Sequence, residues 1–392
     1  MNILSLSTCP LDPTLGSGKT RLRWTEGLRA LGHTVDVAEP KDFETWHGLR
    51  RGLRFRQAYG ATTFIKERIR SKDYDVIECF GGEFGLMLKH LAKLPSRPFT
   101  IAHTDGLELL ASERELAYDP PNTFGRSLHG WYSRQTHERL SRAAFVHADA
   151  FVASSEVERR YVLDLGLYLP HRAAAIEPGL DPFFLSVPFT TNRRPTIAFT
   201  GTWIPRKGIE SLKTVMSRIL NKHREVRLFL YGTGEPSAKV LASFPAEVRD
   251  RVTAHSRLTG REIADGLSRA SIFLFPTYYE GFGMALSEAM ACGCAPVTTP
   301  TGFGATLAHG EEALICDFGD EDAMERSVLN LLHDPALRDR IARNAWERVR
   351  GLTWKANIAR LETLYMQWAS EHQASRGTSA EAAGRVWAHS RA

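Results

Sequence analysis

Residues 276–293 read Pro-Thr-Tyr-Tyr-Glu-Gly-Phe-Gly-Met-Ala-Leu-Ser-Glu-Ala-Met-Ala-Cys-Gly. The apolar run from Ile272 to Pro276 is typical of a buried strand, and the glycines that follow predict a turn that opens a helix. In such a turn backbone N–H groups point at an anion, and the helix N-terminus adds about half a positive charge. We therefore expect a diphosphate to bind here.

Two carboxylates flank this turn. Glu280 lies in the turn, and Glu288 lies more than one turn into the expected helix, so the two need different roles. Each carboxylate can accept hydrogen bonds from the hydroxyls of a sugar or a ribose. The segment alone is also compatible with an ordinary strand-to-helix connection, with Glu280 solvated and Glu288 on an exposed helix face.

The rest of the chain predicts an α/β fold. Short apolar or β-branched runs alternate with helical patterns, which is typical of βαβ units around parallel sheets. We expect strands at residues 2–8, 34–37, 76–80, 99–103, 150–154, 173–176, 196–200, 227–231 and 272–276. A stretch without clear periodicity, 181–195, predicts an interdomain linker.

Two Rossmann-like domains follow from this pattern, because the second half repeats the architecture of the first. The chain has 392 residues, 43% hydrophobic and 24% charged, so it can bury two cores. We expect one domain over 1–182 and a second over 183–353. A C-terminal helix over 354–371 is expected to pack back on the first domain, with a mobile tail over 372–392.

Segment 276–293 resembles the E-x7-E motif of the retaining, GT-B-fold glycosyltransferases known as group 1 or family 4. The resemblance continues over most of the second half of the chain. Residues 176–184 are similar to the family's segment before the linker, and residues 199–208, Phe-Thr-Gly-Thr-Trp-Ile-Pro-Arg-Lys-Gly, are similar to its "F-x-G-R…K-G" loop. Residues 228–234 and 295–302 match its other glycine-bearing strand ends. Several ordered motifs make this signal specific. The resemblance implies that the two domains face each other across a cleft, with 1–182 on the acceptor side and 183–353 binding the nucleotide sugar.

The resemblance implies roles for the motif residues. Lys207 and Arg206 would contact the donor diphosphate and stabilise the departing nucleoside diphosphate, because fixed cations stabilise charge that develops on phosphate oxygen. Glu280 and the turn amides would hold the sugar, and Glu288 would take the ribose hydroxyls. The implied donor-site residues are Gly16, Gly18, Gly201, Thr202, Arg206, Lys207, Gly232, Leu258, Glu280, Gly281, Phe282, Gly283, Met284 and Glu288.

One position departs from the family pattern. Many members carry Arg directly after the first glycine of the 199–208 loop, and this chain has Thr202 there. Either Arg206 supplies the missing charge or donor affinity is modest.

The N-terminal half contains a second glycine-rich loop. Gly18-Lys19-Thr20 is similar to the end of a P-loop, but that motif requires glycine five positions before Gly18 and the chain has Pro13 there. We reject an NTPase. Gly16 and Gly18 instead resemble the family's glycine-rich first turn, which faces the donor across the cleft; a plain helix-capping turn is the alternative.

The end of the strand at 99–103 has two readings. Family members commonly carry an active-site His close to the sugar at this place, and His103 provides the residue type. Alignment on the following Gly-Leu-Glu instead places Asp105 there. The sequence leaves both registers open, and a buried, hydrogen-bonded structural histidine is a third reading for His103. The candidate catalytic residues are therefore His103, Asp105, Lys207 and Glu280.

Charge and cysteine content limit partners and location. The net charge of +5 is a mild excess, and no nucleic-acid reader motif is present. Residues 50–72 carry eight Lys or Arg against Glu67, interleaved with aromatic and aliphatic residues. This mixture suits a helix on anionic lipid, although a solvated basic face or a phosphate-binding acceptor site gives the same pattern. Five cysteines without paired CxxC spacing and a start without a basic n-region favour a cytoplasmic location. Residues 50–72 would then contact the cytoplasmic face of the membrane.

The expected reaction transfers a sugar from a UDP- or GDP-sugar to a hydroxyl acceptor with retained anomeric configuration, in polysaccharide, glycolipid or other glycoconjugate synthesis. The acceptor is expected to be a lipid-linked molecule or a glycan. The resemblance implies no metal and no cofactor. A glycoside hydrolase also uses two carboxylates, but it does not need the phosphate-binding groups. A catalytically silent sugar-nucleotide-binding subunit remains the alternative.

Overall fold

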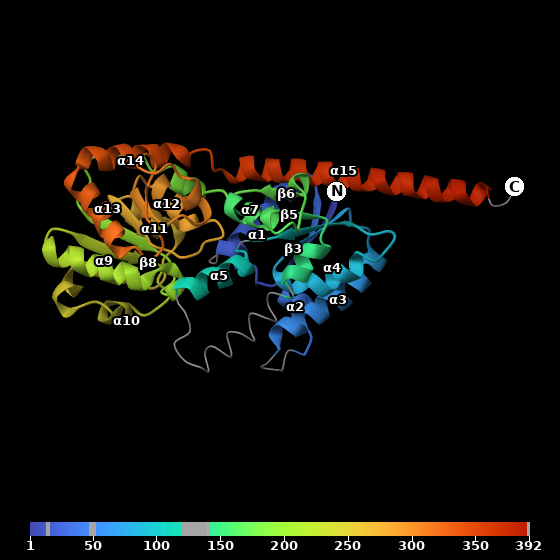
Figure 1. Cartoon of the computed structure of the whole chain (residues 1–392), viewed down its shortest axis with the longest axis horizontal. Helices are drawn as coiled ribbons and strands as arrows, with labels where there is room; N and C mark the ends of the chain where they lie inside the picture. Colours follow the sequence, from blue (N-terminus) through green and yellow to red (C-terminus); the bar gives the residue numbers. More distant parts are fainter. Residues whose placement is uncertain (13–15, 47–51, 105, 119–138, 140, 390–392) are drawn as a thin grey trace.

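The computed structural model describes residues 1–12, 16–46, 52–104, 106–118, 139 and 141–389. Over these ranges the chain forms two parallel sheets of six strands, each covered by helices (Figure 1). Most strands are short and largely buried, as expected where helices cover both faces of a parallel sheet. The predicted α/β class with two Rossmann-like domains is confirmed.

The first sheet has the order β2-β1-β3-β4-β5-β6. Its strands are β1 (Asn2–Ser7), β2 (Thr34–Ala38), β3 (Val76–Phe80), β4 (Phe99–His103), β5 (Ala150–Ala153) and β6 (Ala173–Ala175). The helices of this half are α1 (Gly16–Ala30), α2 (Pro40–Phe43), α3 (Leu53–Ser71), η1 (Gly82–Phe84), α4 (Gly85–Leu91), α5 (Glu108–Tyr118), α7 (Glu156–Asp164), η2 (Pro170–Arg172) and α8 (Pro182–Leu185).

The second sheet has the order β12-β11-β10-β7-β8-β9. Its strands are β7 (Thr196–Thr200), β8 (Arg227–Tyr231), β9 (Val252–His255), β10 (Ile272–Phe275), β11 (Ala295–Thr298) and β12 (Leu314–Ile315). The helices of this half are η3 (Pro205–Lys207), α9 (Ile209–Lys222), α10 (Ser237–Ala242), η4 (Ala246–Arg251), α11 (Gly260–Leu267), α12 (Met284–Ala291), η5 (Gly302–Thr306), α13 (Glu321–His333) and α14 (Pro335–Arg348).

The last helix, α15 (Trp354–His389), leaves the second domain and runs along the first (Figure 1). Its apolar face packs against α1 and the first sheet through Trp354, Ile358, Leu361, Tyr365 and Trp368. The chain crosses between the domains twice at one place, because Leu180 bridges to Thr353. The two domains are therefore joined by paired crossovers and by the α15 contact.

Sequence and structure differ at some boundaries. The helix from Trp354 was expected to end at 371, but α15 is continuous to His389. Residues 372–389 contain five Ala and two Arg, which are good helix formers, and this propensity outweighs the Gly and Ser content that suggested a tail. β9 was not anticipated, since its four residues, Val-Thr-Ala-His, are too short for a clear pattern. The domain limits and the mobility of 372–392 stay predictions.

Candidate functional site

The site lies where strand order reverses in both sheets. In the second sheet the reversal falls between β7 and β10, and in the first between β1 and β3. Ligands of open α/β sheets bind outside the carboxyl ends of strands at such switch points. The loop of residues 201–207 follows β7, and the turn of residues 276–283 follows β10. The two main motifs of the sequence therefore meet at one switch point.

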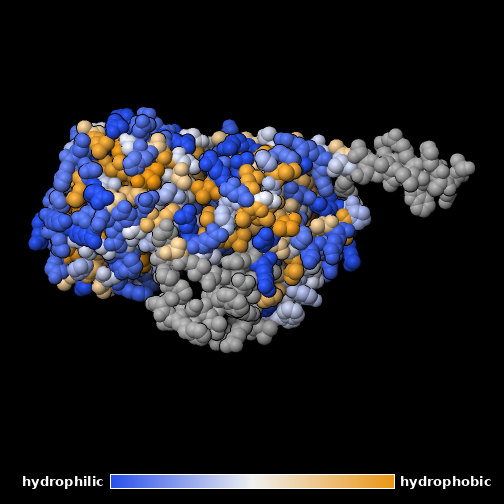
Figure 2. Space-filling view, viewed as in Figure 1, coloured by the Kyte–Doolittle hydropathy of each residue, from blue (hydrophilic) through white to orange (hydrophobic). Residues whose placement is uncertain are grey.

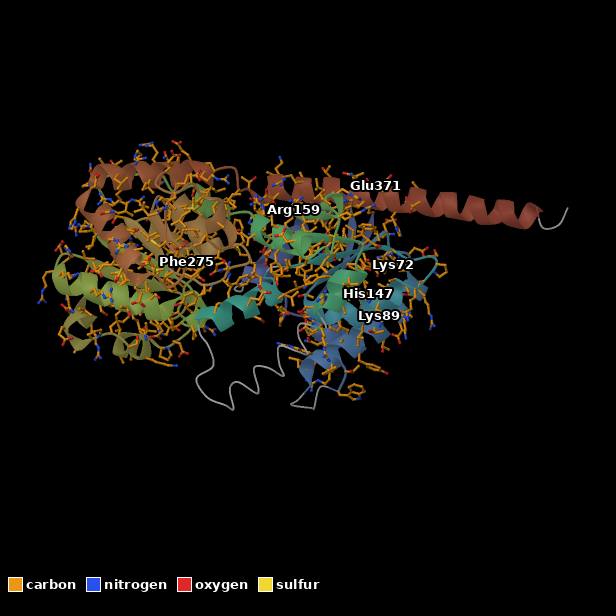
Figure 3. All side chains as sticks on the ribbon, viewed as in Figure 1. Lys72, Lys89, His147, Arg159, Phe275 and Glu371 are labelled. Carbon is orange, nitrogen blue, oxygen red and sulfur yellow. The ribbon has the colours of Figure 1, made fainter. Side chains whose placement is uncertain are left out.

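Lys207 and Glu280 form the centre of this site. The Lys207 ammonium lies 2.7 and 2.9 Å from the two carboxylate oxygens of Glu280. Thr277 donates a further hydrogen bond of 2.9 Å to the same carboxylate. Lys207 also lies over the ring of Phe275, 5.7 Å from its centroid (Figure 3 labels Phe275). Both side chains are less than one-fifth exposed, so the pair is fixed and partly desolvated.

A glycine brings the two motif loops together. Gly208 follows Lys207 with a φ of +69°, and a Cβ there would lie 1.9 Å from the carbonyl oxygen of Pro276. Only glycine fits this left-handed conformation at such a close approach. The backbone of Arg206 is joined to the turn after β10 as well, since its carbonyl accepts hydrogen bonds from Thr277 and Tyr278.

The N-terminus of α12 completes an anion-binding geometry. Gly283, with a φ of +93°, caps this eight-residue helix, which begins at Met284. Its first turn is Met-Ala-Leu, so its positive end meets no acid of its own helix turn. The amide of Glu280 is held by the hydroxyl of Thr301. The dipole of α12 therefore places partial positive charge beside the Lys207–Glu280 pair.

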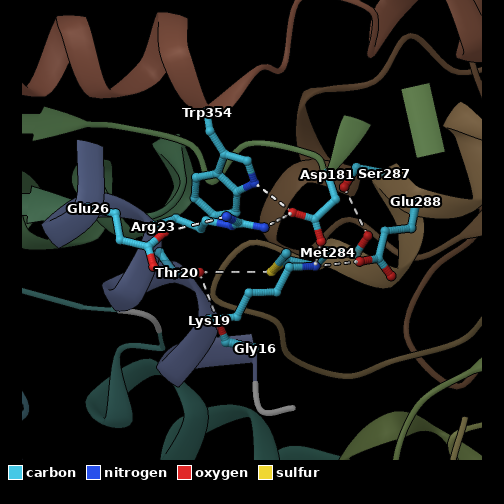
Figure 4. A network of polar contacts seen from close by, with 10 residues as sticks. All are labelled: Gly16, Lys19, Thr20, Arg23, Glu26, Asp181, Met284, Ser287, Glu288 and Trp354. Carbon is cyan, nitrogen blue, oxygen red and sulfur yellow. Dashed lines mark hydrogen bonds and ion pairs between the residues drawn. The ribbon is translucent and has the colours of Figure 1, made fainter. Parts of the chain in front are cut away.

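Glu288 lies within a network that crosses the cleft (Figure 4). The Lys19 ammonium lies 2.8 Å from Asp181 and 3.6 Å from Glu288. Burial raises the pKa of Glu288 to about 7, although Lys19 opposes this effect. Burial also favours the neutral form of Asp181, but Lys19 and Arg23 outweigh it and hold its pKa below the usual range. Asp181 further accepts a hydrogen bond from the Trp354 indole.

The remaining predicted donor residues lie at several places. Gly16 lies against Met284, and Gly18 packs on the backbone of Asp12. Gly201, Thr202 and Gly232 lie at the ends of β7 and β8, and Thr202 is exposed. Phe282 is buried in the core and Gly281 precedes it in the turn. Leu258 instead lines a groove of about 680 Å³ beside Tyr231 and His255.

A cavity of about 240 Å³ opens on the N-terminal side of the cleft. Its walls come from the loops after β1, β3 and β4, including Thr8, Gly81 and Glu108, and from Arg206 of the other domain. The Arg206 Nε is buried and has no hydrogen-bond partner among the residues that the structure describes. Ser141 donates a hydrogen bond to Glu108 in this wall. The cavity is therefore lined by polar groups from both domains.

His103 borders this cavity, yet its side chain is fully buried. Its Nε2 lies 2.6 Å from the Tyr365 hydroxyl of α15, which also donates a hydrogen bond to Glu78. Burial and the nearby Arg21 lower the pKa of His103 to about 3, so the ring is neutral at physiological pH. Asp105 lies outside the described residues. The role of each as a sugar-facing residue stays a prediction.

One cross-domain contact was not anticipated. Glu158 of α7 is completely buried and accepts hydrogen bonds from Tyr279 (2.7 Å), the Leu107 amide (2.6 Å) and Ser154 (3.0 Å). Tyr279 immediately precedes Glu280, and Leu107 follows β4, whose last residue is His103. Glu158 therefore joins the turn after β10 to the segment after β4. Its position in an amphipathic helix gave no signal, because a Glu in such a pattern is normally solvated.

Two Rossmann-like domains facing across a cleft, with an anion site at the switch point of the second, define the GT-B class. Residues 194–334 match the sequence model of the family described as glycosyl transferases group 1. The matched segment lies within the second domain.

Relatives of known name show the same likeness. The chain is 26% identical over 241 residues to a D-inositol 3-phosphate glycosyltransferase of Thermobispora bispora, covering 56% of each chain. It is 26% identical over 230 residues to a phosphatidyl-myo-inositol mannosyltransferase of Mycolicibacterium smegmatis, covering 55% of this chain and 56% of the relative. The chain thus spans about half the length of the curated relatives it matches.

Solved structures support the fold. A sucrose-phosphate synthase from Thermosynechococcus elongatus superposes with a TM-score of 0.75 at 21% identity, covering 95% of this chain and 100% of that one. WaaG, a glycosyltransferase involved in lipopolysaccharide biosynthesis, gives a TM-score of 0.70 at 16% identity, covering 92% and 98%. At these identities the likeness shows the fold alone.

Proposed function

We propose that the chain is a retaining glycosyltransferase that moves a sugar from a nucleoside diphosphate sugar, with uridine or guanosine as the base, to a hydroxyl acceptor. The observation that carries the proposal is the Lys207–Glu280 pair beside the N-terminus of α12. A cation, a helix dipole and a hydroxyl-binding carboxylate at one switch point suit a sugar diphosphate better than any neutral ligand.

Each group has a distinct task. Lys207 and Arg206 stabilise the charge on the leaving diphosphate, which is where negative charge develops in the transition state. Glu280 and the amides of Phe282, Gly283 and Met284 hold the transferred sugar, and Glu288 accepts hydrogen bonds from the ribose. The chemistry uses these groups without a metal ion.

Retention follows from departure and attack on the same face of the sugar. The anomeric C–O bond breaks with its electron pair going to the phosphate oxygen, and the acceptor oxygen forms the new bond. The acceptor proton passes to the departing phosphate. Both oxygens of Glu280 are engaged by Lys207, which makes this carboxylate a poor nucleophile and argues against a covalent enzyme intermediate. Domain closure excludes water that would hydrolyse the donor.

The acceptor is assigned to the N-terminal side, in a glycoconjugate pathway. The 240 Å³ cavity faces the donor loop through Arg206 and has hydroxyl and carboxylate groups in its wall. Two relatives carry names that refer to phosphatidylinositol acceptors, and one of these, from Corynebacterium glutamicum, is named as GDP-mannose-dependent. A lipid-linked or glycan acceptor is consistent with both observations.

Helix α3 supports contact with an anionic membrane on the cytoplasmic face. Trp46, Leu53, Phe55 and Tyr59 are each about half exposed, and Trp46 stacks on Tyr59 at 5.3 Å. Basic residues Lys66, Arg68 and Arg70 of the same helix are exposed. Figure 2 shows hydrophobic residues interspersed with hydrophilic ones on this side of the N-terminal domain. Among the described residues, no helix is long and apolar enough to cross a membrane.

A donor screen tests the proposal. Thermal unfolding is measured with UDP-, GDP- and ADP-sugars, because a ligand that binds only the native state raises apparent stability. One nucleotide class is expected to stabilise the wild type, and Lys207→Ala should abolish that shift. Lys239→Ala, which removes an exposed lysine of the same domain, is the matched control. Equal shifts in wild type and Lys207→Ala would contradict the phosphate assignment.

An assay of donor hydrolysis distinguishes an enzyme from a catalytically silent binding subunit. The purified chain should slowly hydrolyse its donor, and Glu280→Ala should lose this activity while keeping its fold. Binding without any hydrolysis or transfer would favour the silent subunit.

A further inference from the structure

Lys19 belongs to a sequence feature that the proposed function has not used. The Gly-Lys-Thr run is not a P-loop, yet the structure directs its lysine across the cleft. The Lys19 ammonium lies between Asp181 and Glu288, at 2.8 and 3.6 Å (Figure 4). Only 18% of its side chain is exposed. A lysine held this closely by two carboxylates is not a solvated surface residue.

The packing around the first turn of α1 positions Lys19 to extend across the cleft. A Cβ on Gly18 would lie 2.3 Å from the carbonyl oxygen of Asp12, so the backbone of Asp12 packs directly on this turn. Thr20 bonds back to the Gly16 carbonyl at 2.9 Å and lies 3.9 Å from the sulfur of Met284. The start of α1 thus rests on the start of α12, which bears Glu288 one turn further on.

The charged groups around Glu288 act in opposite directions. Burial and the nearby Asp181 disfavour its ionised form, and Lys19 favours it. Burial raises the pKa of the Cys292 thiol, four residues further along, and the charge of Glu288 adds to this effect. The opposing effects of burial, Asp181 and Lys19 leave the pKa of Glu288 near 7, so loss of the Lys19 charge would change how much of this carboxylate is ionised at neutral pH. An ionised carboxylate accepts hydrogen bonds through both oxygens, whereas the protonated acid gives up part of that capacity.

We propose that Lys19 is a positioning residue of the donor site, supplied by the N-terminal domain, which keeps Glu288 ionised and oriented to accept the two ribose hydroxyls of the donor. The proposal rests on the ribose role proposed for Glu288. Because Lys19 comes from the opposite domain, Glu288 gains this support only when the domains are together. The structure thereby links ribose recognition to closure of the cleft.

Three variants separate this role from general packing. Lys19→Met keeps most of the side-chain volume and removes the charge, and Lys19→Arg restores it. Arg23→Gln is the matched control, because Arg23 also comes from α1 but pairs with Asp181 at 3.2 Å and with Glu26 at 3.4 Å rather than with Glu288. The titration of Glu288 is followed by infrared spectroscopy of its carboxyl band, which Glu288→Gln identifies by its loss.

Lys19→Met should move the pKa of Glu288 clearly above 7, whereas Arg23→Gln leaves it near 7 and Lys19→Arg restores it. The same result in Lys19→Met and Arg23→Gln would overturn the proposal. This titration needs no donor, so it decides the Lys19–Glu288 link even if the proposed function fails.

Donor binding is then measured by calorimetry with UDP-glucose and GDP-mannose between pH 6 and 8. A nucleotide sugar has no free terminal phosphate, so its own charge is constant in this range. The wild type should bind more tightly as pH rises through 7. Lys19→Met should weaken binding at pH 7 about ten-fold or more and move the transition to higher pH. If neither donor binds the wild type, the proposed function is contradicted. If Lys19→Met binds the donor as tightly as the wild type at every pH, the positioning role of Lys19 is contradicted.

Discussion

The buried hydrogen bond between Tyr279 and Glu158 predicts that contact between the two domains helps to hold the turn that carries Glu280. Tyr279→Phe removes the hydroxyl that donates to Glu158 at 2.7 Å. Hydrogen bonds to charged groups contribute about 1.5–3 kcal/mol. If the bond exists only when the domains meet, its loss shifts the closed state by about 10- to 150-fold, since 1.4 kcal/mol is ten-fold. The KM for the donor should rise by up to that factor.

Tyr278→Phe is the control for this prediction. Its hydroxyl lies 3.4 Å from that of Ser211, a residue of the same domain. Donor KM and the free energy of unfolding in urea are measured for both variants. We expect Tyr279→Phe to raise KM and lower stability, and Tyr278→Phe to do neither to a comparable degree. Equal, small effects of the two variants on KM would refute the reasoning.

Three further predictions concern stability, each measured by urea unfolding. The raised pKa of Glu288 means that the folded protein binds this proton more tightly than the unfolded chain does, so the free energy of unfolding falls as pH rises from 4.5 to about 7. Glu288→Gln should remove a fall of up to about 3 kcal/mol over that range. The same dependence of unfolding free energy on pH in the variant and the wild type would contradict this prediction. Tyr365→Phe should cost about 1–3 kcal/mol, because the buried Glu78 loses its donor from α15; no loss would show that the contact is not formed. Gly208→Ala should cost about 2–5 kcal/mol, from backbone strain and the clash with Pro276; Gly310→Ala has similar strain but open space, and equal costs would argue against the close approach.

The sequence predicted the motifs of the site but not their partners. The glycine-rich turn and the loop ending in Lys207 were both expected to bind the donor, and the structure brings them together. That Lys207 pairs with Glu280 follows from the adjacency of β7 and β10, which depends on strand order rather than on any local pattern. The resemblance implied a ribose role for Glu288, but it did not predict the ion pair of Glu288 with Lys19, which spans the two domains.

Glu158 marks the limit of prediction from sequence. It lies 121 residues from Tyr279, and nothing near it in the sequence distinguishes it from the solvated acids of other helices. His103 shows the opposite case. The reading as a buried, hydrogen-bonded histidine fits its contact with Tyr365, a residue of α15 that lies 262 positions away. In both cases the deciding partner is supplied by an element that local periodicity does not connect to the residue.

Two largely buried carboxylates at the interface, Glu158 and Glu288, each depend on a group from the other domain. A buried carboxylate costs several kcal/mol unless it is paired and hydrogen-bonded. Glu158 of the N-terminal domain receives a hydrogen bond from Tyr279 of the C-terminal domain, and Glu288 of the C-terminal domain pairs with Lys19 of the N-terminal domain. Separation of the domains would therefore remove Tyr279 from Glu158 and Lys19 from Glu288. In the proposed reaction, closure would pair both acids at the same step that encloses the donor.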